Sequence, residues 1–129
     1  PRILERKPQA RIECLVQEKF LPVARRAVES LEKVHPAARG RLGLVVGDIT
    51  AHGLGIEAGR ASELRSSLRE AYHLAAVYDL AVKEDVARLV NVEGTRNVLE
   101  FLERAQGFDR LHYVSTAYVS GTFEGVFKW

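Results

Sequence analysis

The chain has 129 residues, of which 47% are hydrophobic and 28% charged, and its formal net charge at pH 7 is +2. This length suits one domain with its own core, and a small charge with interleaved signs does not favour a nucleic-acid partner. No apolar run approaches the ~20 residues that a membrane-spanning helix needs. The charged opening "PRILERKPQARIE" does not resemble a signal peptide.

Cysteine and histidine are too sparse to predict a disulfide or a metal site. Cys14 is the only cysteine, and the histidines lie far apart in sequence, at His35, His52, His73 and His112. We expect this lone cysteine to be a small buried hydrophobic residue of a protein in a reducing compartment. We therefore expect a cytoplasmic protein without a bound metal.

Strands and helices alternate along the chain. Short apolar runs predict buried parallel strands at residues 11–16, 41–46, 71–76 and 110–115. Between the first two, apolar residues recur at helical spacing from Phe20 to Val34, and Pro36 and Gly40 end that helix. A polar helix is expected around 61–69, and the longest helix at about 83–106, capped by Gly107. Repeated strand–helix–strand units predict a doubly wound α/β fold, a parallel sheet with helices on both faces.

The residues that follow the predicted strands have the chemistry of a binding site. In doubly wound sheets, ligands bind beyond the carboxyl ends of the strands. Each residue alone has a simpler interpretation, because an Asp after Gly often only forms a turn and a Ser-Thr pair often only caps one. Their shared place on one edge favours a site, made of Gln17 to Lys19, Gly47 and Asp48, Ala75 and Ala76, and Ser115 and Thr116.

The glycines of "GLGIEAG" imitate a phosphate-binding loop without its context. Such a loop turns directly from a strand into a helix whose first N–H groups face the phosphates. Here "DITAH" intervenes, and the helix that follows is short and polar. We interpret Gly53, Gly55 and Gly59 as part of a connection.

Several motifs in this order resemble the extended short-chain dehydrogenase/reductases: "GDIT", "GLGI", "HLAAVYDL", "NVEGTRNVLEF" and "HYVSTAYVSG". Within that family the pattern is similar to the branch of fatty acyl-CoA reductases and thioester reductases, the male-sterility type. The resemblance runs from about residue 11 to residue 121. It implies a Rossmann-like sheet and a nicotinamide dinucleotide cofactor.

The resemblance also implies roles for residues that hold the cofactor. Asp48 matches the carboxylate that accepts from the exocyclic amine of adenine, and Ile49 matches the residue that packs on the ring. Ala75 and Ala76 match small residues that let the backbone approach the cofactor, and His73 precedes them on the strand.

The preference between NADP and NAD depends on two further residues. Gln17 stands where relatives that prefer NADP often carry an arginine, and Lys19 follows closely enough to attract a 2′-phosphate. We therefore favour NADP over NAD.

Catalytic roles follow from the same resemblance. Thr116 matches the hydroxyl that binds the substrate carbonyl oxygen and stabilises the developing oxyanion, with Ser115 as its neighbour. Asn91 matches the residue that steadies the helix beside the active site and supports its proton relay. Gly94 lies inside the same predicted helix, where glycine is costly, so we expect a close approach to the sheet or the cofactor there. The family also uses a Tyr-x-x-x-Lys pair, and no tyrosine in this sequence has a lysine four residues on.

These comparisons predict that residues 1–129 are a partial NAD(P)-binding Rossmann-like domain. The family's first strand, its glycine-rich turn and the part after the Ser/Thr strand do not occur here, so we expect an internal part of a longer reductase. The intact protein would reduce an acyl thioester, on CoA or a carrier protein, by hydride transfer. By itself this chain is expected to be inactive.

Three alternatives remain open. Two are enzymes of the same fold, a sugar-nucleotide epimerase and a hydroxysteroid-type dehydrogenase, and "STAYV" in place of "SSxxVYG" argues against the epimerase. The third is a catalytically dead α/β module.

The strand order of the family makes a further prediction. Its first strand lies between the strands predicted here at 11–16 and 71–76. The four strands should therefore form two pairs, 11–16 with 41–46 and 71–76 with 110–115. Unpaired apolar edges predict self-association of the isolated chain.

Overall fold

The strands form two parallel pairs in the computed structural model, which describes residues 2–77, 81–115 and 125. β1 (Ile12–Val16) pairs with β2 (Leu42–Val46), with Ile12 opposite Leu42 and Val16 opposite Val46. β3 (Glu70–His73) pairs with β4 (Arg110–Tyr113). Parallel pairing and the predicted partners are both confirmed, and the strands alternate with helices as a doubly wound α/β fold requires.

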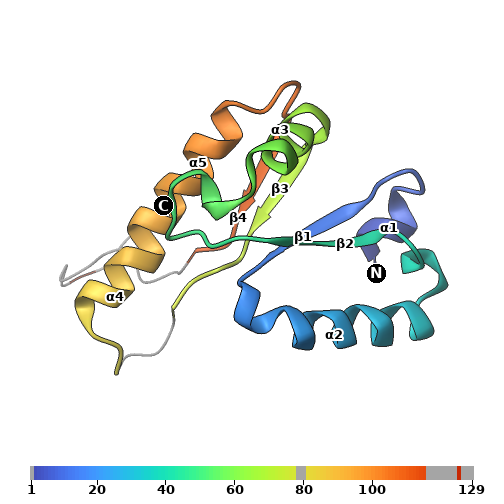
Figure 1. Ribbon diagram of the computed structural model, residues 1–129, viewed down its shortest axis with the longest axis horizontal. Helices are drawn as coiled ribbons and strands as arrows, with labels where there is room; N and C mark the ends of the chain where they lie inside the picture. Colours follow the sequence, from blue (N-terminus) through green and yellow to red (C-terminus); the bar gives the residue numbers. More distant parts are fainter. Residues whose placement is uncertain (1, 78–80, 116–124, 126–129) are drawn as a thin grey trace.

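Each of the two strand pairs has its own helices beside it. α1 (Arg2–Arg6) and α2 (Leu21–Val34) lie beside β1 and β2. α4 (Glu84–Arg88), a π turn (Leu89–Glu93) and α5 (Gly94–Glu103) form one long run beside β3 and β4 (Figure 1). Between the pairs, a 3-10 turn (His52–Gly55) leads into α3 (Ala58–Ser67). Short 3-10 turns at Glu18–Phe20 and Pro36–Ala38 flank α2.

Several predicted boundaries differ from the structure. The third strand ends at His73 and not at residue 76, and just beyond it the backbone of Val77 bonds to the side chain of Asn91. The fourth strand ends at Tyr113. The long helix ends at Glu103, before the predicted cap at Gly107, and the N–H of Gln106 donates to the carbonyl of Arg65 in α3.

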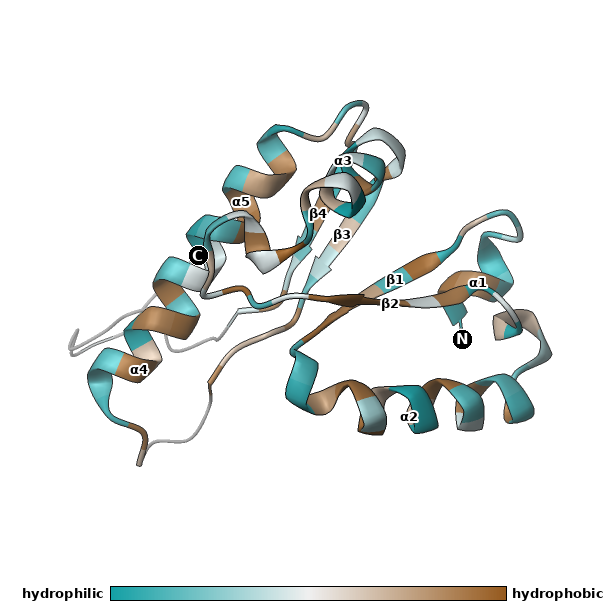
Figure 2. Ribbon diagram, viewed as in Figure 1, coloured by the Kyte–Doolittle hydropathy of each residue, from teal (hydrophilic) through white to brown (hydrophobic). Residues whose placement is uncertain are grey.

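The apolar stripe of α2 is only partly buried. Ala24 and Val28 are half-buried, whereas Phe20 and Val34 are 53% and 72% exposed. Figure 2 shows the mixture of apolar and polar residues along this helix. The helical spacing predicted which residues share a face, but the two strands beside α2 cover only part of it.

The main core lies where α3 and α5 meet the end of β2. Its buried members are Val45, Leu54, Ala61, Leu64, Phe101 and Leu102. Partly buried side chains from β3 and β4, Ala71 and Leu111, pack against this cluster. The core therefore joins the two strand pairs. Cys14 on β1 lies outside it and is exposed, so the expectation that it would be buried is wrong.

Candidate functional site

The first part of the site lies at the carboxyl ends of β1 and β2. Gln17 directly follows β1, and Asp48 lies two residues after β2. The Nε2 of Gln17 donates to Oδ2 of Asp48 at 2.7 Å, so the two predicted site residues are in direct contact.

Asp48 is held as a carboxylate by its neighbours. Its Oδ1 accepts from the backbone N–H of Thr50 and from the Thr50 hydroxyl, each at 2.8 Å. These two bonds lower the pKa of Asp48 below its ordinary value, and the Gln17 amide and the charge of Lys19 lower it further against a partial loss of hydration. An ionised, oriented acceptor results.

Ile49 and Lys19 complete this part. Ile49 packs against Gly94, where an added Cβ would lie 2.9 Å from the Cδ1 of Ile49. The close approach expected of this helical glycine is therefore made to Ile49. The carbonyl of Ile49 accepts from Nδ2 of Asn97 at 2.7 Å. Lys19 is exposed, with its Nζ 5.0 Å from the ring centre of Phe20.

The second part of the site lies beyond β3. Residues 74–77, which we call the strap, have no regular structure; Ala75 is exposed and Ala76 is half-buried. Asn91, in the π turn, accepts from the N–H of Val77 at 2.8 Å and donates to its carbonyl at 3.1 Å. The helix thus holds the strap through the N–H and the carbonyl of Val77.

His73 directly precedes this strap, and its backbone is bonded to the segment before Ser115. His73 ends β3 with only 5% of its surface exposed, and burial lowers the pKa of its imidazole. Its carbonyl accepts from the N–H of Val114 at 3.1 Å, which ties the end of β3 to the residue before Ser115. Ser115 is exposed, and Thr116 lies outside the described residues.

The glycine-containing loop has the character of a connection. Glu57 caps α3, and its carboxylate accepts from the N–H groups of Gly59 and Arg60 at 2.8 and 2.9 Å. The donors that a phosphate would need are therefore already occupied by a carboxylate.

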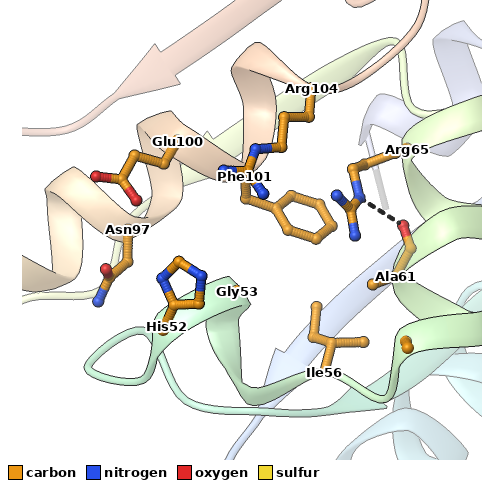
Figure 3. A pocket seen from close by; sticks show the side chains of 10 residues that line it. His52, Gly53, Ile56, Ala61, Arg65, Asn97, Glu100, Phe101 and Arg104 are labelled. Atoms are coloured by element: carbon orange, nitrogen blue, oxygen red, sulfur yellow. Dashed lines mark hydrogen bonds between the residues drawn. The ribbon is translucent and has the colours of Figure 1, made fainter.

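A separate pocket lies between the 3-10 turn, α3 and α5. Its volume is about 210 Å³. The guanidinium of Arg65 lies 5.0 Å from the ring centre of Phe101, and Figure 3 shows both side chains at this pocket. His52, Asn97 and Arg104 also line it, and none of the predicted site residues does. The carboxyl edge of the strands remains the better candidate site, because the residues with matching chemistry meet there.

Several residues that organise the site were not predicted. Thr50 stands two residues after Asp48, a spacing at which aspartate commonly bonds to the following backbone, so this contact was accessible from sequence. Thr95 and Asn97 contact residues 22 and 48 positions away, and no local pattern indicates such contacts.

The family follows from a comparison with known domains. Residues 1–128 match the family model described as "Male sterility protein", a family of NAD-binding domains. The chain belongs to this family. Its cofactor class is accordingly a nicotinamide dinucleotide, as the motifs predicted.

Male-sterility-type relatives include reductases. The chain is 28% identical over 88 residues to "Fatty acyl-CoA reductase wat" of Drosophila melanogaster, covering 68% of this chain and 17% of that protein. It is also 28% identical over 120 residues to a linear gramicidin synthase of Brevibacillus parabrevis, covering 90% of this chain and 2% of that protein. The chain therefore spans a small part of both relatives.

Solved reductase domains share the fold. The terminal R domain of the myxalamid PKS-NRPS pathway aligns with a TM-score of 0.71 at 32% identity, over 88% of this chain and 30% of that one. The R domain of a nonribosomal peptide synthetase from Mycobacterium tuberculosis gives 0.71 at 25%, over 95% and 30%. The reductase domain of PhqB from Penicillium fellutanum, at 22% identity and a TM-score of 0.67, covers 98% and 35% and shows the fold alone.

The carboxyl edge fits a dinucleotide of this class. A carboxylate offers about four acceptor positions, and the bonds from Thr50 and Gln17 occupy three of those on Asp48. One position is left for an external N–H donor such as an adenine amine, beside the apolar Ile49.

The described residues contain neither a cluster of metal ligands nor a membrane-spanning helix. Across 2–77, 81–115 and 125, no three side chains of His, Cys, Asp or Glu gather as metal ligands would. No helix in that part of the chain is long and apolar enough to cross a membrane.

Proposed function

We propose that this chain is the cofactor-binding part of an NADP-dependent reductase that converts an acyl thioester by hydride transfer. The observation that carries the proposal is the direct contact of Gln17 with Asp48 at the carboxyl edge of a male-sterility-type domain. The reductases among its relatives give the reaction class. The bound cofactor supplies the hydride.

The residues that follow β2 bind the adenosine end of the cofactor. Asp48 accepts from the adenine amine, and Ile49 packs on the ring. Ala75 and Ala76, on the strap, let the backbone approach the dinucleotide because they carry no bulky side chain.

Lys19 supplies the preference for NADP. The amide of Gln17 is engaged by Asp48, whereas the side chain of Lys19 is exposed and its charge acts on the same carboxylate. Lys19→Ala should raise the KM for NADPH by roughly 10–100-fold, the value of one hydrogen bond to a charged group. The KM for NADH should stay within about twofold, and an equal rise for both cofactors would contradict this role.

Thr116 and Ser115 act on the substrate. In this proposal the Thr116 hydroxyl donates to the thioester carbonyl oxygen and stabilises the oxyanion as hydride arrives. Asn91 keeps the neighbouring helix and strap in place. The proton donor is the family's tyrosine, paired with a lysine, and this sequence does not contain that pair.

The test uses the complete natural gene product that carries this chain, whatever its length. Oxidation of NADPH or NADH is followed with an acyl-CoA, with an acyl-carrier thioester and with a sugar nucleotide as substrates. Thioester-dependent oxidation supports the proposal. Turnover of only the sugar nucleotide or of a hydroxysteroid would replace it by one of the alternatives, and cofactor binding without any turnover would favour the inactive module.

We propose that the isolated 129-residue chain neither turns over nor remains monomeric. Turnover fails because the Tyr-x-x-x-Lys pair is absent from the sequence. Association follows because, among the described residues, β1 pairs only with β2 and β3 only with β4, which leaves the other edge of each unpaired. Light scattering and a thermal melt decide the second part, and a monomer with a sharp melt would contradict it. The cytoplasmic location expected from the lone Cys14 stays a prediction.

A further inference from the structure

His73 is the most unusual polar residue of the described chain. It is the only polar side chain among the described residues that is buried, at 5% exposure. A buried polar group costs free energy unless it is hydrogen-bonded. Its imidazole should therefore have a specific partner.

That partner is Thr95, in the first turn of α5. The Nε2 of His73 lies 3.0 Å from Oγ1 of Thr95, and the same hydroxyl donates to the carbonyl of Asn91 at 2.7 Å. A hydroxyl has one hydrogen. Since Asn91 receives it, Thr95 accepts from His73, which assigns the hydrogen of the neutral imidazole to Nε2.

The hydrogen bonds from His73 to Thr95 and from Thr95 to Asn91 form a series that we call the relay. It ends on Asn91, the residue that holds the strap. Asn91 lies in the π turn, where the N–H of Gly94 donates to the carbonyl of Leu89, and such turns occur mostly as local irregularities at functional sites. Its carbonyl receives the Thr95 hydroxyl while its side chain holds both polar groups of Val77. The orientation of Asn91 is thereby fixed from two sides.

His73 also contacts the segment that follows β4, through its backbone. Its carbonyl accepts from the N–H of Val114, and its ring stacks on that of Tyr113 with the centres 5.3 Å apart. One residue therefore joins the end of β4, which precedes Ser115, to the helix that carries Asn91. The strap begins at residue 74, directly after His73.

We propose that His73 is a positioning residue: through the Thr95 hydroxyl it fixes Asn91, and thereby holds the strap against the helix in the conformation that admits the cofactor. The cofactor part of this inference rests on the proposed function. The mechanical part does not, because every contact in the relay lies within the described chain.

The alternative is that His73 and Thr95 only satisfy each other as buried polar groups. The two interpretations differ at Val77, whose backbone groups bond to the Asn91 side chain and not to either of these two side chains. A relay transmits the loss of the Thr95 hydroxyl to the Val77 amide, whereas mere local satisfaction leaves that amide unchanged.

Amide hydrogen exchange on the complete natural gene product, without cofactor, separates them. Thr95→Val keeps the shape of the side chain and removes its hydroxyl, and Thr95→Ser is the matched control that keeps the hydroxyl. His73→Gln can place an amide N–H near the position of Nε2, and His73→Leu cannot. We expect Thr95→Val and His73→Leu to speed exchange of the Val77 amide roughly two- to tenfold, the equivalent of one neutral hydrogen bond, with Thr95→Ser and His73→Gln close to wild type.

The same variants distinguish the inference from the proposed function. If Val77 exchange is unchanged in Thr95→Val and His73→Leu while both fold, the relay is overturned. If exchange accelerates, the relay stands even where the wild-type protein proves not to be a thioester reductase. In an active protein, Thr95→Val should weaken binding of NADPH, measured by nicotinamide fluorescence, and Thr95→Ser should restore it. Unchanged NADPH binding in Thr95→Val would overturn the cofactor part alone.

Discussion

The carboxyl ends of the two strand pairs are organised by different kinds of contact. After β2, Asp48 is oriented mainly by Thr50, two residues away, with one further hydrogen bond from Gln17, which lies 31 residues earlier in the chain. After β3, the strap is held by Asn91, which is 14 residues from Val77, and by a relay from His73 to Thr95 across 22. The first end is built by a local turn, whereas the second depends on how a helix is placed.

This difference predicts different functional roles for the two ends. A local turn keeps its shape when distant parts shift, which suits a fixed acceptor for the adenosine end. A strap held by a helix moves with that helix, and it lies beside the segment that precedes Ser115 and Thr116. We therefore expect changes at the first end to alter cofactor affinity with little effect on the rate. Changes at the second end should alter the rate as well as cofactor affinity, because the strap precedes the reacting segment and also admits the cofactor.

The largest effect should come from Thr116→Val in the complete gene product. Valine keeps the shape and removes the hydroxyl, so kcat should fall roughly 10²–10³-fold, as for the loss of one oxyanion donor. Cofactor affinity should be unchanged. Thr116→Ser is the control and should retain most of the rate. A valine variant with full kcat would transfer the role to Ser115, to be tested as Ser115→Ala.

Asp48→Asn should have the opposite signature. The new amide nitrogen cannot accept from Gln17 or from an adenine amine, so the Kd for NADPH should rise roughly 10–100-fold. The kcat at saturating cofactor should change little. Glu57→Gln is the matched control, because Glu57 is likewise a carboxylate that accepts backbone N–H groups, at the start of α3. Equal loss of affinity in both variants would mean that the effect is one of folding.

The contact between the two ends can be tested at Gly94 and Ile49. Gly94→Ala places a Cβ 2.9 Å from the Cδ1 of Ile49. Overpacking costs about 1–3 kcal/mol, and alanine regains about 1 kcal/mol of helix propensity, so the free energy of unfolding should fall by up to about 2 kcal/mol. Ile49→Val deletes Cδ1 and should remove most of that cost. Urea unfolding of the double-mutant cycle measures this coupling, and additive costs would show that Ile49 is not what Gly94 accommodates.

Part of the first end could be predicted from the sequence, because the two bonds from Thr50 to Asp48 are local. "GDIT" places an acceptor two residues before a hydroxyl donor, and the strand before it was predicted from a short apolar run. Gly94 was predicted to be a site of close approach because glycine is costly inside a helix. The strand pairing followed from the doubly wound order, which is a property of the whole fold.

The second end was predicted in its residues and not in its connections. His73 and Asn91 were singled out, but their link through Thr95 was not, because no periodicity joins positions 22 residues apart. The π turn was also missed. Val86, Val90, Gly94 and Val98 recur every four residues, which suits a continuous helix equally well, and the irregular turn coincides with the tertiary bond between Asn91 and Val77.

The smallest expected effect is a pH dependence that belongs to the second end. Burial lowers the folded-state pKa of His73 below its ordinary value of 6.5. Above pH 6.5 the imidazole is neutral in both states, and its titration contributes nothing to the pH dependence of stability. As the pH falls through 6.5, the unfolded chain binds this proton more readily than the folded protein does. The free energy of unfolding therefore decreases until the folded-state pKa is reached.

The slope is isolated by comparison with His73→Gln, which does not titrate there. Urea unfolding between pH 7.5 and about pH 5 should show a steeper loss of stability in the wild type than in this variant. The ring signals of His73 in an NMR titration should give a midpoint below the ordinary value. Identical slopes in the two proteins would mean that His73 is hydrated in solution, and the buried hydrogen bond to Thr95 would then have to be abandoned.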